Sequence, residues 1–569
     1  MAPGGPATAP VLFPVPRVPH PQGHAARRAP ATLPRVSAAQ DGDLPPAPTP
    51  GSPPSGQYPA GAPPSSAPSP DGSVSAPSPA PDRAPPRSAV LLTDHYELTM
   101  IEAALRSGAA ARRCVFEVFA RRLPNGRRYG VVGGTGRLLD ALGSFRFGDD
   151  ELSELSRRGV VDRDTLDWLA RYRFRGDVLG YGEGETFLPG SPILTVEAGF
   201  AEAVLLETLA LSVLNHDSAI AAAASRMVTA AHGRPCLEMG SRRTHEEAAV
   251  AAARVAWLAG FAGTSNLEAG RRYGIPTIGT SAHAFTLLHD DEREAFAAQV
   301  ASLGPGTTLL VDTYDVPTGV RRAVEAAGTG LGAVRIDSGD LLEQAYAVRR
   351  QLDELGARNT RIVVTSDLDE HAIAALAAAP VDTYGVGTCL VTGSGAPTAG
   401  LVYKLVAREA PSGELVPVAK RSLDKTSIGG RKWAVRRRDE QNRAVAEVIG
   451  LGGPPTPEDG DRELLRVLVR DGEVVGAEPL AAARDRHRIS FAELPVTAHK
   501  LSRGEPAIPT LVESRYLAAA PWPDRDGIVG DVVPRSAPGR TGEAAPHPTG
   551  GAGSRTAGEP APRTTGGQP

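Results

Sequence analysis

The sequence has few cysteines, few aromatic residues and no strong excess of charge of either sign. Its three cysteines, Cys114, Cys236 and Cys389, are far apart and lack paired spacing, which argues against a disulfide framework and a zinc knuckle. We expect them to be buried apolar residues. The 61 basic and 65 acidic side chains give a formal net charge of −4, so no overall field favours nucleic acid as a partner.

Long apolar runs are also missing from the sequence. No stretch approaches the roughly 18 apolar residues that a bilayer span needs. The first residues also lack the basic segment and continuous apolar segment of a secretory signal. We therefore expect a cytoplasmic protein that has no membrane partner.

The two ends of the sequence contain too little apolar material to build a core. Residues 1–88 and 524–569 are rich in Pro, Ala, Ser and Gly, as in "PPAPTPGSPPSGQYPAGAPPSSAPSP". Such a composition cannot bury enough apolar surface to offset the loss of chain entropy. Both ends are predicted to be disordered tails, although the first could also serve as an interaction arm.

Between residues 208 and 402, short β-branched apolar runs alternate with helical patterns. The runs are "CLEMGSRR", "IPTIGTSAHAF", "TTLLVDTYDV", "LGAVRIDSGDL", "RIVVTSDLDE" and "VDTYGVGTCLVTG". This alternation predicts an α/β fold with parallel βαβ units. A βα barrel and a doubly wound sheet both fit, and both place their sites at the carboxyl ends of the strands. The flanks, residues 89–207 and 403–523, are expected to build a second α/β domain together.

Polar residues follow several of these runs. "RIDSGD" (Arg335–Asp340) could bind sugar hydroxyls or a hydrated Mg²⁺, or could simply cap a helix. "YGVGTCLVTGSG" (Tyr384–Gly395) suits a phosphate-binding loop. Arg242 and Arg243 could hold a carboxylate or stack on an aromatic ring, or could belong to a solvated charge run.

His283 follows the apolar run that ends at Gly279. An imidazole with a pKa of about 6.5 can act as a base or as a nucleophile toward phosphorus. A hydrogen-bonded structural histidine would look the same in the sequence. Spacing alone leaves the question open.

Several phrases occur in an order that resembles nicotinate phosphoribosyltransferases, from Leu91 to about Leu517. They are "LLTDHYELTM", "EMGSRR", "GFAGTSNLEAGRRYGIPTIGTSAHAF", "LLVDTYD", "VRIDSGDL", "TSDLDE", "GVGT" and "VYKLV". The resemblance implies an irregular, incomplete βα barrel of the type II phosphoribosyltransferase kind, residues 208–402. It also implies an α/β sandwich domain formed by 89–207 and 403–523. The family works as a homodimer with active sites at the subunit interface.

The resemblance also implies an activity in NAD salvage. Nicotinate and 5-phosphoribosyl 1-diphosphate would give nicotinate mononucleotide and diphosphate, coupled to ATP hydrolysis through a phosphohistidine and assisted by Mg²⁺. Quinolinate and nicotinamide phosphoribosyltransferases, and a non-catalytic binding paralogue, are the alternatives. The ligands of Mg²⁺ stay unassigned.

Residue roles carry over from the family position by position. His283 matches the phosphorylated histidine, and Asp312 and Asp315 could fix its tautomer or hold a metal-bound water. Tyr96 matches the tyrosine that stacks on the pyridine ring from the partner subunit. The other matching positions are Arg335 and Asp337 as catalytic residues, Arg242 and Arg243 beside the base, Gly279 and Thr280 before the histidine, Ser338, Gly339 and Asp340 near the ribose and diphosphate, and Gly385, Gly387 and Thr388 around the 5-phosphate.

Three positions depart from the family pattern. Ala284 stands where serine usually follows the phosphorylated histidine, so one hydroxyl contact to the phosphoryl group is lost. His95 and Glu97 flank Tyr96 in place of the usual neighbours, and His245 ends a "RRTH" segment. None of these changes removes a residue that the chemistry requires.

Overall fold

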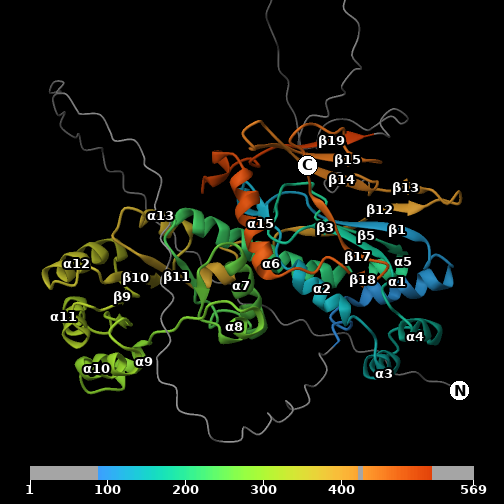
Figure 1. Ribbon diagram of the computed structural model, residues 1–569. Coiled ribbons are helices and arrows are strands. Elements are labelled where there is room, and N and C mark those ends of the chain that lie inside the picture. Colours follow the sequence, from blue (N-terminus) through green and yellow to red (C-terminus); the bar gives the residue numbers. More distant parts are fainter. Residues whose placement is uncertain (1–87, 421–426, 515–569) are drawn as a thin grey trace, which may run out of the picture. The chain divides into compact units, whose positions relative to one another are not determined.

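The fold is described for residues 88–420 and 427–514 in a computed structural model (Figure 1). The two predicted tails, 1–88 and 524–569, lie outside these residues except for Ser88. In the described part of the chain, no helix is both long enough and apolar enough to cross a bilayer.

A six-stranded parallel sheet occupies the segment predicted to be a barrel. Its strands follow the order β7-β6-β11-β10-β9-β8, and every neighbouring pair is parallel. The strands are β6 (Cys236–Glu238), β7 (Gly263–Thr264), β8 (Thr308–Leu310), β9 (Ala333–Ile336), β10 (Arg361–Ser366) and β11 (Thr383–Val386).

The strand order distinguishes a barrel from a doubly wound sheet. Neighbouring strands are consecutive in the chain, except that the last strand, β11, pairs with the first, β6. A doubly wound sheet would instead reverse direction at a switch point. The ring is open only between β7 and β8, so the sheet is an incomplete βα barrel.

The strand predicted in "IPTIGTSAHAF" is wrong. Thr277 makes a single bridge to Thr264 of β7, and no strand follows before α9 (His283–Leu287). Pro276 has no N–H to donate to a ladder, and β7 offers only two residues to pair with. The segment therefore lies as an irregular loop in the opening of the barrel.

Helices follow the strands, as the alternating pattern predicts (Figure 1). Five of them begin at an Asp or Asn whose side chain accepts a backbone N–H, which fixes the turn into the helix. All the helices of the barrel region after α6 (Glu207–Ala230) are α7 (Glu246–Leu258), α8 (Leu267–Tyr273), α9, α10 (Glu292–Leu303), α11 (Val316–Ala327), α12 (Leu341–Glu354), α13 (Glu370–Ala375) and α14 (Thr388–Val391).

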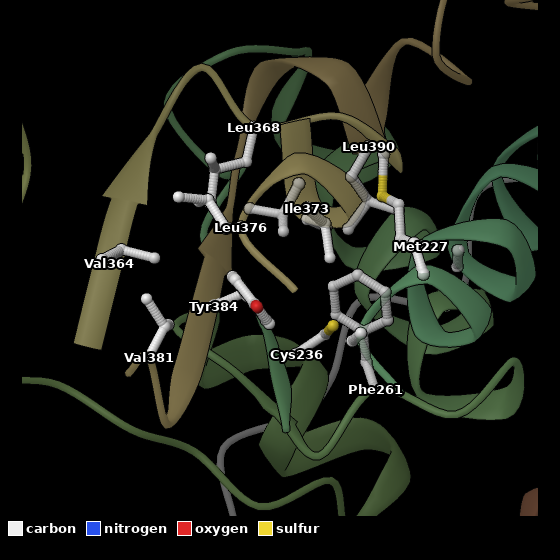
Figure 2. Packing of buried hydrophobic residues seen from close by; sticks show 14 of the residues in the cluster. Met227, Cys236, Phe261, Val364, Leu368, Ile373, Leu376, Val381, Tyr384 and Leu390 are labelled. Atoms are coloured by element: carbon white, nitrogen blue, oxygen red, sulfur yellow. The ribbon is translucent and has the colours of Figure 1, made fainter. Parts of the chain in front are cut away.

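Helix α6 (Glu207–Ala230) has 24 residues and lies against the barrel sheet. Most of its second half is buried, so it lacks the one-sided apolar stripe of a surface helix. Figure 2 shows Met227 of α6 in one core with Cys236 of β6, Phe261 and Tyr384 of β11. This packing fixes the sheet whose strand ends carry the predicted site.

The two flanks share an antiparallel sheet of seven strands, in the order β13-β12-β1-β5-β3-β17-β18. Strand β1 pairs with β5 on one side and with β12 on the other. The strands are β1 (Arg113–Ala120), β3 (Asp177–Tyr181), β5 (Leu194–Gly199), β12 (Leu401–Glu409), β13 (Leu415–Pro417), β17 (Leu465–Arg470) and β18 (Glu473–Val474). Segments on both sides of the barrel therefore build one sheet.

Two smaller sheets and further helices complete these flanks. A four-stranded sheet contains β14 (Lys432–Arg438), β15 (Ala444–Leu451), β16 (Arg462–Glu463) and β19 (Thr510–Ser514), and β2 (Gly130–Val131) pairs with β4 (Thr186–Phe187). The helices are α1 (His95–Arg106), α2 (Thr135–Gly143), α3 (Asp149–Arg158), α4 (Arg163–Ala170), α5 (Phe200–Val204) and α15 (Leu480–Glu493), with short 3₁₀ turns at Pro124–Gly126 and Val496–His499.

The proposed division into two domains stays a prediction. Helix α6 contacts β2, α2 and β12 of the flanks as well as α7 and α13 of the barrel, and the described residues belong to one compact unit. Of the three cysteines, Cys114 and Cys236 are buried as expected, whereas Cys389 is half-buried.

Candidate active site

A polar cavity of about 250 Å³ lies at the carboxyl ends of the barrel strands. This is the edge at which parallel βα units place their functional side chains. Its walls come from the carboxyl-terminal parts of β9, β10 and β11 and from residues just after these strands and β6: Met239, Arg242, Arg243, Arg335, Asp337, Thr365, Ser366, Asp367, Gly385, Gly387 and Thr388. Seven of the predicted site residues therefore meet in one cavity: Arg242, Arg243, Arg335, Asp337, Gly385, Gly387 and Thr388.

His283 is the first residue of α9 and lies beside this cavity. Its Nε2 is 3.8 Å from Oδ2 of Asp337, and its Nδ1 is 3.1 Å from the hydroxyl of Thr313. The side chain is 39% exposed, so its ring remains accessible to a ligand. Because Thr313 contacts Nδ1, an Nδ1–H donated to this hydroxyl leaves the lone pair on Nε2, the nitrogen that faces the cavity-lining carboxylate.

Asp337 is held in its ionised form. Burial by itself would raise the pKa of Asp337, but the hydrogen bond from Thr365 and the charge of Arg335 outweigh it and lower the net pKa. The Arg335 guanidinium donates to Oδ1 at 3.2 Å and to the Thr365 hydroxyl at 3.0 Å. It also donates to the carbonyl oxygen of Ser281 at 3.2 Å. Arg335 thereby ties the loop before His283 to the end of β9.

Asp312 holds the segment that contains Asp337 and Ser338, and it does not contact His283. Its Oδ2 accepts hydrogen bonds from the Asp337 backbone N–H at 2.9 Å and from the Ser338 hydroxyl at 2.6 Å. Asp315 caps α11 by accepting from the backbone N–H of Thr318 at 3.0 Å. The suggestion that Asp312 or Asp315 fixes the histidine tautomer is therefore wrong, because the hydroxyl of Thr313 contacts Nδ1.

Arg242 and Arg243 project from the loop after β6. Both side chains are exposed and line the cavity. The loop is anchored by Glu238, which is fully buried and accepts hydrogen bonds from Thr264 and from the backbone N–H of Gly240. Two guanidinium groups at an open cavity are suited to hold anionic groups of a ligand.

Small residues allow the strand ends to approach each other closely. A Cβ on Gly385 would lie 2.5 Å from Thr365 Cγ2 and 2.8 Å from Met239 Sδ, so a side chain there would displace both cavity walls. Ser366 has φ of 154°, a backbone conformation that a serine adopts only when its surroundings impose it. Both positions belong to the cavity wall.

The remaining positions of the "RIDSGD" segment are partly structural. Gly339 has φ of 80°, which favours glycine. Asp340 caps α12 by accepting from the backbone N–H of Glu343 at 3.1 Å, the alternative that its sequence position had left open. Thr280 approaches Arg335 at 3.5 Å, and Gly279 precedes it in the exposed loop.

Tyr96 is not part of this cavity. It lies on α1, its side chain is 45% exposed, and its pKa is raised by burial and by the neighbouring Glu207 and Glu97. Glu97 beside it is fully buried and accepts hydrogen bonds from the backbone N–H and the hydroxyl of Thr208. The chain by itself therefore does not bring Tyr96 to His283.

Sequence reasoning assigned no role to several residues of the site. Thr313 and Thr365 contact His283 and Asp337, and Met239, Ser366 and Asp367 line the cavity. All five lie at or just after the carboxyl ends of barrel strands, so the rule that places sites there could have included them.

Comparisons with known proteins agree with this geometry. The model of the nicotinate phosphoribosyltransferase N-terminal domain matches residues 91–215, and the model of the nicotinate phosphoribosyltransferase family matches residues 235–441. A nicotinate phosphoribosyltransferase of Mycobacterium tuberculosis is 59% identical over 439 residues, which are 76% of this chain and 96% of that protein. The enzyme of that name from Bacillus subtilis is 38% identical over 363 residues, 62% of this chain and 74% of that protein.

Solved structures show the same fold. The crystal structure of human nicotinic acid phosphoribosyltransferase has a TM-score of 0.65 at 25% identity and covers 75% of this chain and 98% of that one. Nicotinate-nucleotide pyrophosphorylase from Pyrococcus furiosus has a TM-score of 0.59 at 24% identity and covers 71% of this chain and 96% of that one. The domain matches and the 59% identity together show that the chain belongs to the nicotinate phosphoribosyltransferase family.

Proposed function

We propose that the chain transfers the phosphoribosyl group of 5-phosphoribosyl 1-diphosphate to nicotinate, forming nicotinate mononucleotide and diphosphate in NAD salvage. We further propose that the reaction is coupled to ATP hydrolysis through a phosphohistidine at His283. The observation that supports this most is the meeting of His283, Asp337 and Arg335 beside a cavity with two further arginines, in a member of this family.

The transfer step breaks the bond between ribose C1 and the diphosphate and joins C1 to the ring nitrogen of nicotinate. Charge builds up on the leaving diphosphate and on an oxocarbenium-like ribose, so fixed cations and carboxylates can stabilise the transition state. Arg242 and Arg243 are placed to bind the carboxylate or stack on the ring of nicotinate. The loop Gly385–Thr388 offers a place for the 5-phosphate.

The energy-coupling step uses His283 as a nucleophile. A ring nitrogen attacks the γ-phosphorus of ATP, the N–P bond forms, and the bond to the ADP oxygen breaks, so that ADP leaves. Water later attacks the same phosphorus, breaks the N–P bond and releases phosphate. Nε2 is the better candidate for the attacking nitrogen, because it faces the cavity-lining Asp337 while Thr313 contacts Nδ1.

A magnesium ion would fit this site mainly through the substrate. Asp337 and Asp367 both line the cavity, and the described residues contain no cluster of three or more metal-ligating side chains. One or two carboxylates together with phosphate oxygens and water are the usual setting for Mg²⁺. When bound, the ion supplies positive charge against the diphosphate, while Asp337 and Asp367 would orient it.

The proposed active form is a cytoplasmic homodimer in which Tyr96 of one subunit stacks on the pyridine ring bound by the other. The position of Tyr96 outside the cavity of its own chain supports this arrangement. Mixing inactive Tyr96→Ala and His283→Ala chains tests it. If Tyr96 acts across the interface, random pairing restores about a quarter of the wild-type activity, whereas a tyrosine acting within its own chain restores none.

The activity itself is tested by diphosphate release from 5-phosphoribosyl 1-diphosphate and Mg²⁺ with nicotinate, nicotinamide or quinolinate, each with and without ATP. We expect release with nicotinate that rises on adding ATP. Release with another pyridine would reassign the chain to that activity. No release with any pyridine would leave a binding paralogue as the better description.

A further inference from the structure

A second cavity lies away from the candidate active site and is larger, at about 420 Å³. It is bounded by α6, α15 and the end of α7, and shares no lining residue with the active-site cavity. A volume of several hundred cubic ångströms is in the range of small-molecule sites. The name groove is used below for this cavity between α6 and α15.

The walls of the groove are two helical stripes. Residues spaced three and four apart lie on one face of a helix. From α6 and the residues just after it, the wall is formed by Ser225, Val228, Thr229 and His232. From α15, it is formed by Arg484, His487, Arg488 and Phe491.

Fixed contacts keep this groove open. His487 of α15 accepts a hydrogen bond at Nε2 from the hydroxyl of Ser225 on α6 at 3.1 Å, since its Nδ1 faces the carbonyl of Gly184. Helix α7 contacts both α6 and α15 and ends at Leu258, two residues before Gly260. Gly260 has φ of 117°, and a Cβ there would lie 3.1 Å from Val228, so only glycine leaves this wall undisturbed.

Two arginines, Arg484 and Arg488, line the groove with one carboxylate, Asp485. Arg484 donates to the carbonyl oxygens of Trp257, Gly260 and Phe261, and none of its contacts among the described residues is an ion pair with a carboxylate. Carbonyl dipoles orient a guanidinium but do not neutralise it, and burial lowers the pKa of Arg484. Asp485 approaches Arg488 at 3.9 Å, and its charge also acts on Arg484. With two arginines and one carboxylate, these three residues leave one positive charge in excess.

Beyond Arg484, Arg488 and Asp485, the groove wall is largely apolar or aromatic. Phe491 stacks on His499 with ring centroids 4.6 Å apart and an angle of 17° between the rings. Burial lowers the pKa of His487 to about 4 and also lowers the pKa of His499, so both imidazoles are neutral at pH 7. A flat aromatic wall with one positive charge in excess favours a planar aromatic ring that carries a negatively charged group.

We propose that the groove between α6 and α15 is a second binding site, specific for a planar aromatic anion whose charge pairs with Arg484. Aromatic acids and nucleotides both combine an aromatic ring with a negatively charged group, so either could bind there. The proposal is independent of the transferase activity, because it uses no residue of the active-site cavity.

The test uses the full chain and two matched fluorescent probes. 8-Anilinonaphthalene-1-sulfonate is an aromatic anion with a planar naphthalene ring system, and N-phenyl-1-naphthylamine has the same rings without the charge. We expect one molecule of the anion to bind per chain and Arg484→Gln to weaken that binding at least tenfold. Binding of the neutral probe should change less than about threefold.

Three variants separate loss of the site from loss of the fold. Arg484→Lys keeps the charge and should retain most of the affinity for the anion. Val228→Trp should fill the groove and abolish binding of both probes, while Arg350→Gln removes an exposed arginine of α12 and should change nothing. Each variant is first checked for an unchanged unfolding midpoint, and Val228→Trp decides the question if Arg484→Gln does not fold.

Competition identifies the kind of ligand and excludes the active site. Displacement of the anionic probe by 2-naphthoate points to an aromatic acid, and displacement by AMP points to a nucleotide. Displacement by nicotinate with 5-phosphoribosyl 1-diphosphate would overturn the proposal, because the probe would then lie in the catalytic cavity. Equal binding of the two probes, insensitive to Arg484→Gln, would overturn it as well.

Discussion

Charged residues are used differently in the sheets of the flanks and at the carboxyl ends of the barrel sheet. In the sheets of the flanks, Arg436 and Glu447 are fully buried and 3.0 Å apart, and Lys432 pairs with Glu117 at 2.7 Å, both almost fully buried. At the parallel sheet, His283 and Asp337 are each more than 30% exposed and stand 3.8 Å apart.

The difference separates charges that hold the fold from charges that meet a ligand. A buried ion pair holds the fold because removing one member leaves the other charge without a partner in a medium of low dielectric constant, which destabilises the folded state. A half-exposed carboxylate beside a histidine can still bind or orient a substrate. Substitutions should therefore change stability in the first region and catalysis in the second.

The largest expected effect is on stability at the buried pair. Glu447→Gln should lower the free energy of unfolding by about 3–5 kcal/mol, because the charge of Arg436 loses its partner. Tyr181 also donates to this carboxylate at 2.7 Å. Denaturant unfolding measures the effect, and Glu268→Gln, at an exposed ion pair, is the matched control that should leave the midpoint nearly unchanged. Equal shifts of the unfolding midpoint in both variants would contradict the distinction between buried and exposed ion pairs.

The next effect is a dependence of stability on pH that comes from His487. Its pKa is lowered by burial to about 4, whereas it is about 6.5 in an unfolded chain. Between these values the unfolded state binds a proton that the folded state does not. Stability is therefore complete above pH 6.5 and falls by about 1.4 kcal/mol per unit toward pH 4, by up to about 3 kcal/mol.

His487→Gln tests this assignment, because glutamine does not titrate. Unfolding measured from pH 7 to pH 4 should show a shallower loss of stability in the variant than in the parent chain. An unchanged slope would mean that other groups cause the acid sensitivity.

A comparable effect, but on catalysis, is expected at Asp337. Asp337→Asn keeps the shape but removes the negative charge beside His283 and Arg335, so the rate of diphosphate release should fall about 100-fold. The unfolding midpoint should move much less than in Glu447→Gln. A strongly destabilised Asp337→Asn chain would place this carboxylate with the structural charges instead.

The smallest effect is expected at Thr313, a positioning residue for His283. Thr313→Val removes the hydroxyl at Nδ1 and should lower the ATP stimulation about tenfold, with little change in the KM for nicotinate. Thr313→Ser keeps a hydroxyl and should retain most of the ATP stimulation. Because the tautomer would no longer be fixed, the pH profile of the ATP-stimulated rate should also shift in the valine variant.

The barrel region could be predicted from the sequence because short-range patterns determine it. Strands such as β9 and β10 are apolar on both faces, and the caps Asp315, Asp340 and Asp369 fix the turns into their helices. The position of Arg335 and Asp337 at a strand end follows from the same pattern.

Other features could not be predicted because they depend on contacts between distant segments. The contact between His283 and Thr313 joins residues 30 positions apart, and no periodicity encodes it. The apolar run at Ile275 resembles a strand, but it lies next to a two-residue edge strand that cannot extend the ladder. Helix α6 shows no one-sided pattern because most of its second half is buried.

The most direct test of the account is to locate the phosphoryl group that ATP delivers. The full chain is incubated with γ-labelled ATP and Mg²⁺, digested without acid, and its peptides are examined by mass spectrometry. We predict an acid-labile phosphoryl group on His283, lost when nicotinate and 5-phosphoribosyl 1-diphosphate are added and absent from His283→Ala. ATP-stimulated diphosphate release without a phosphoryl group on His283, or with one on another residue, would contradict the account.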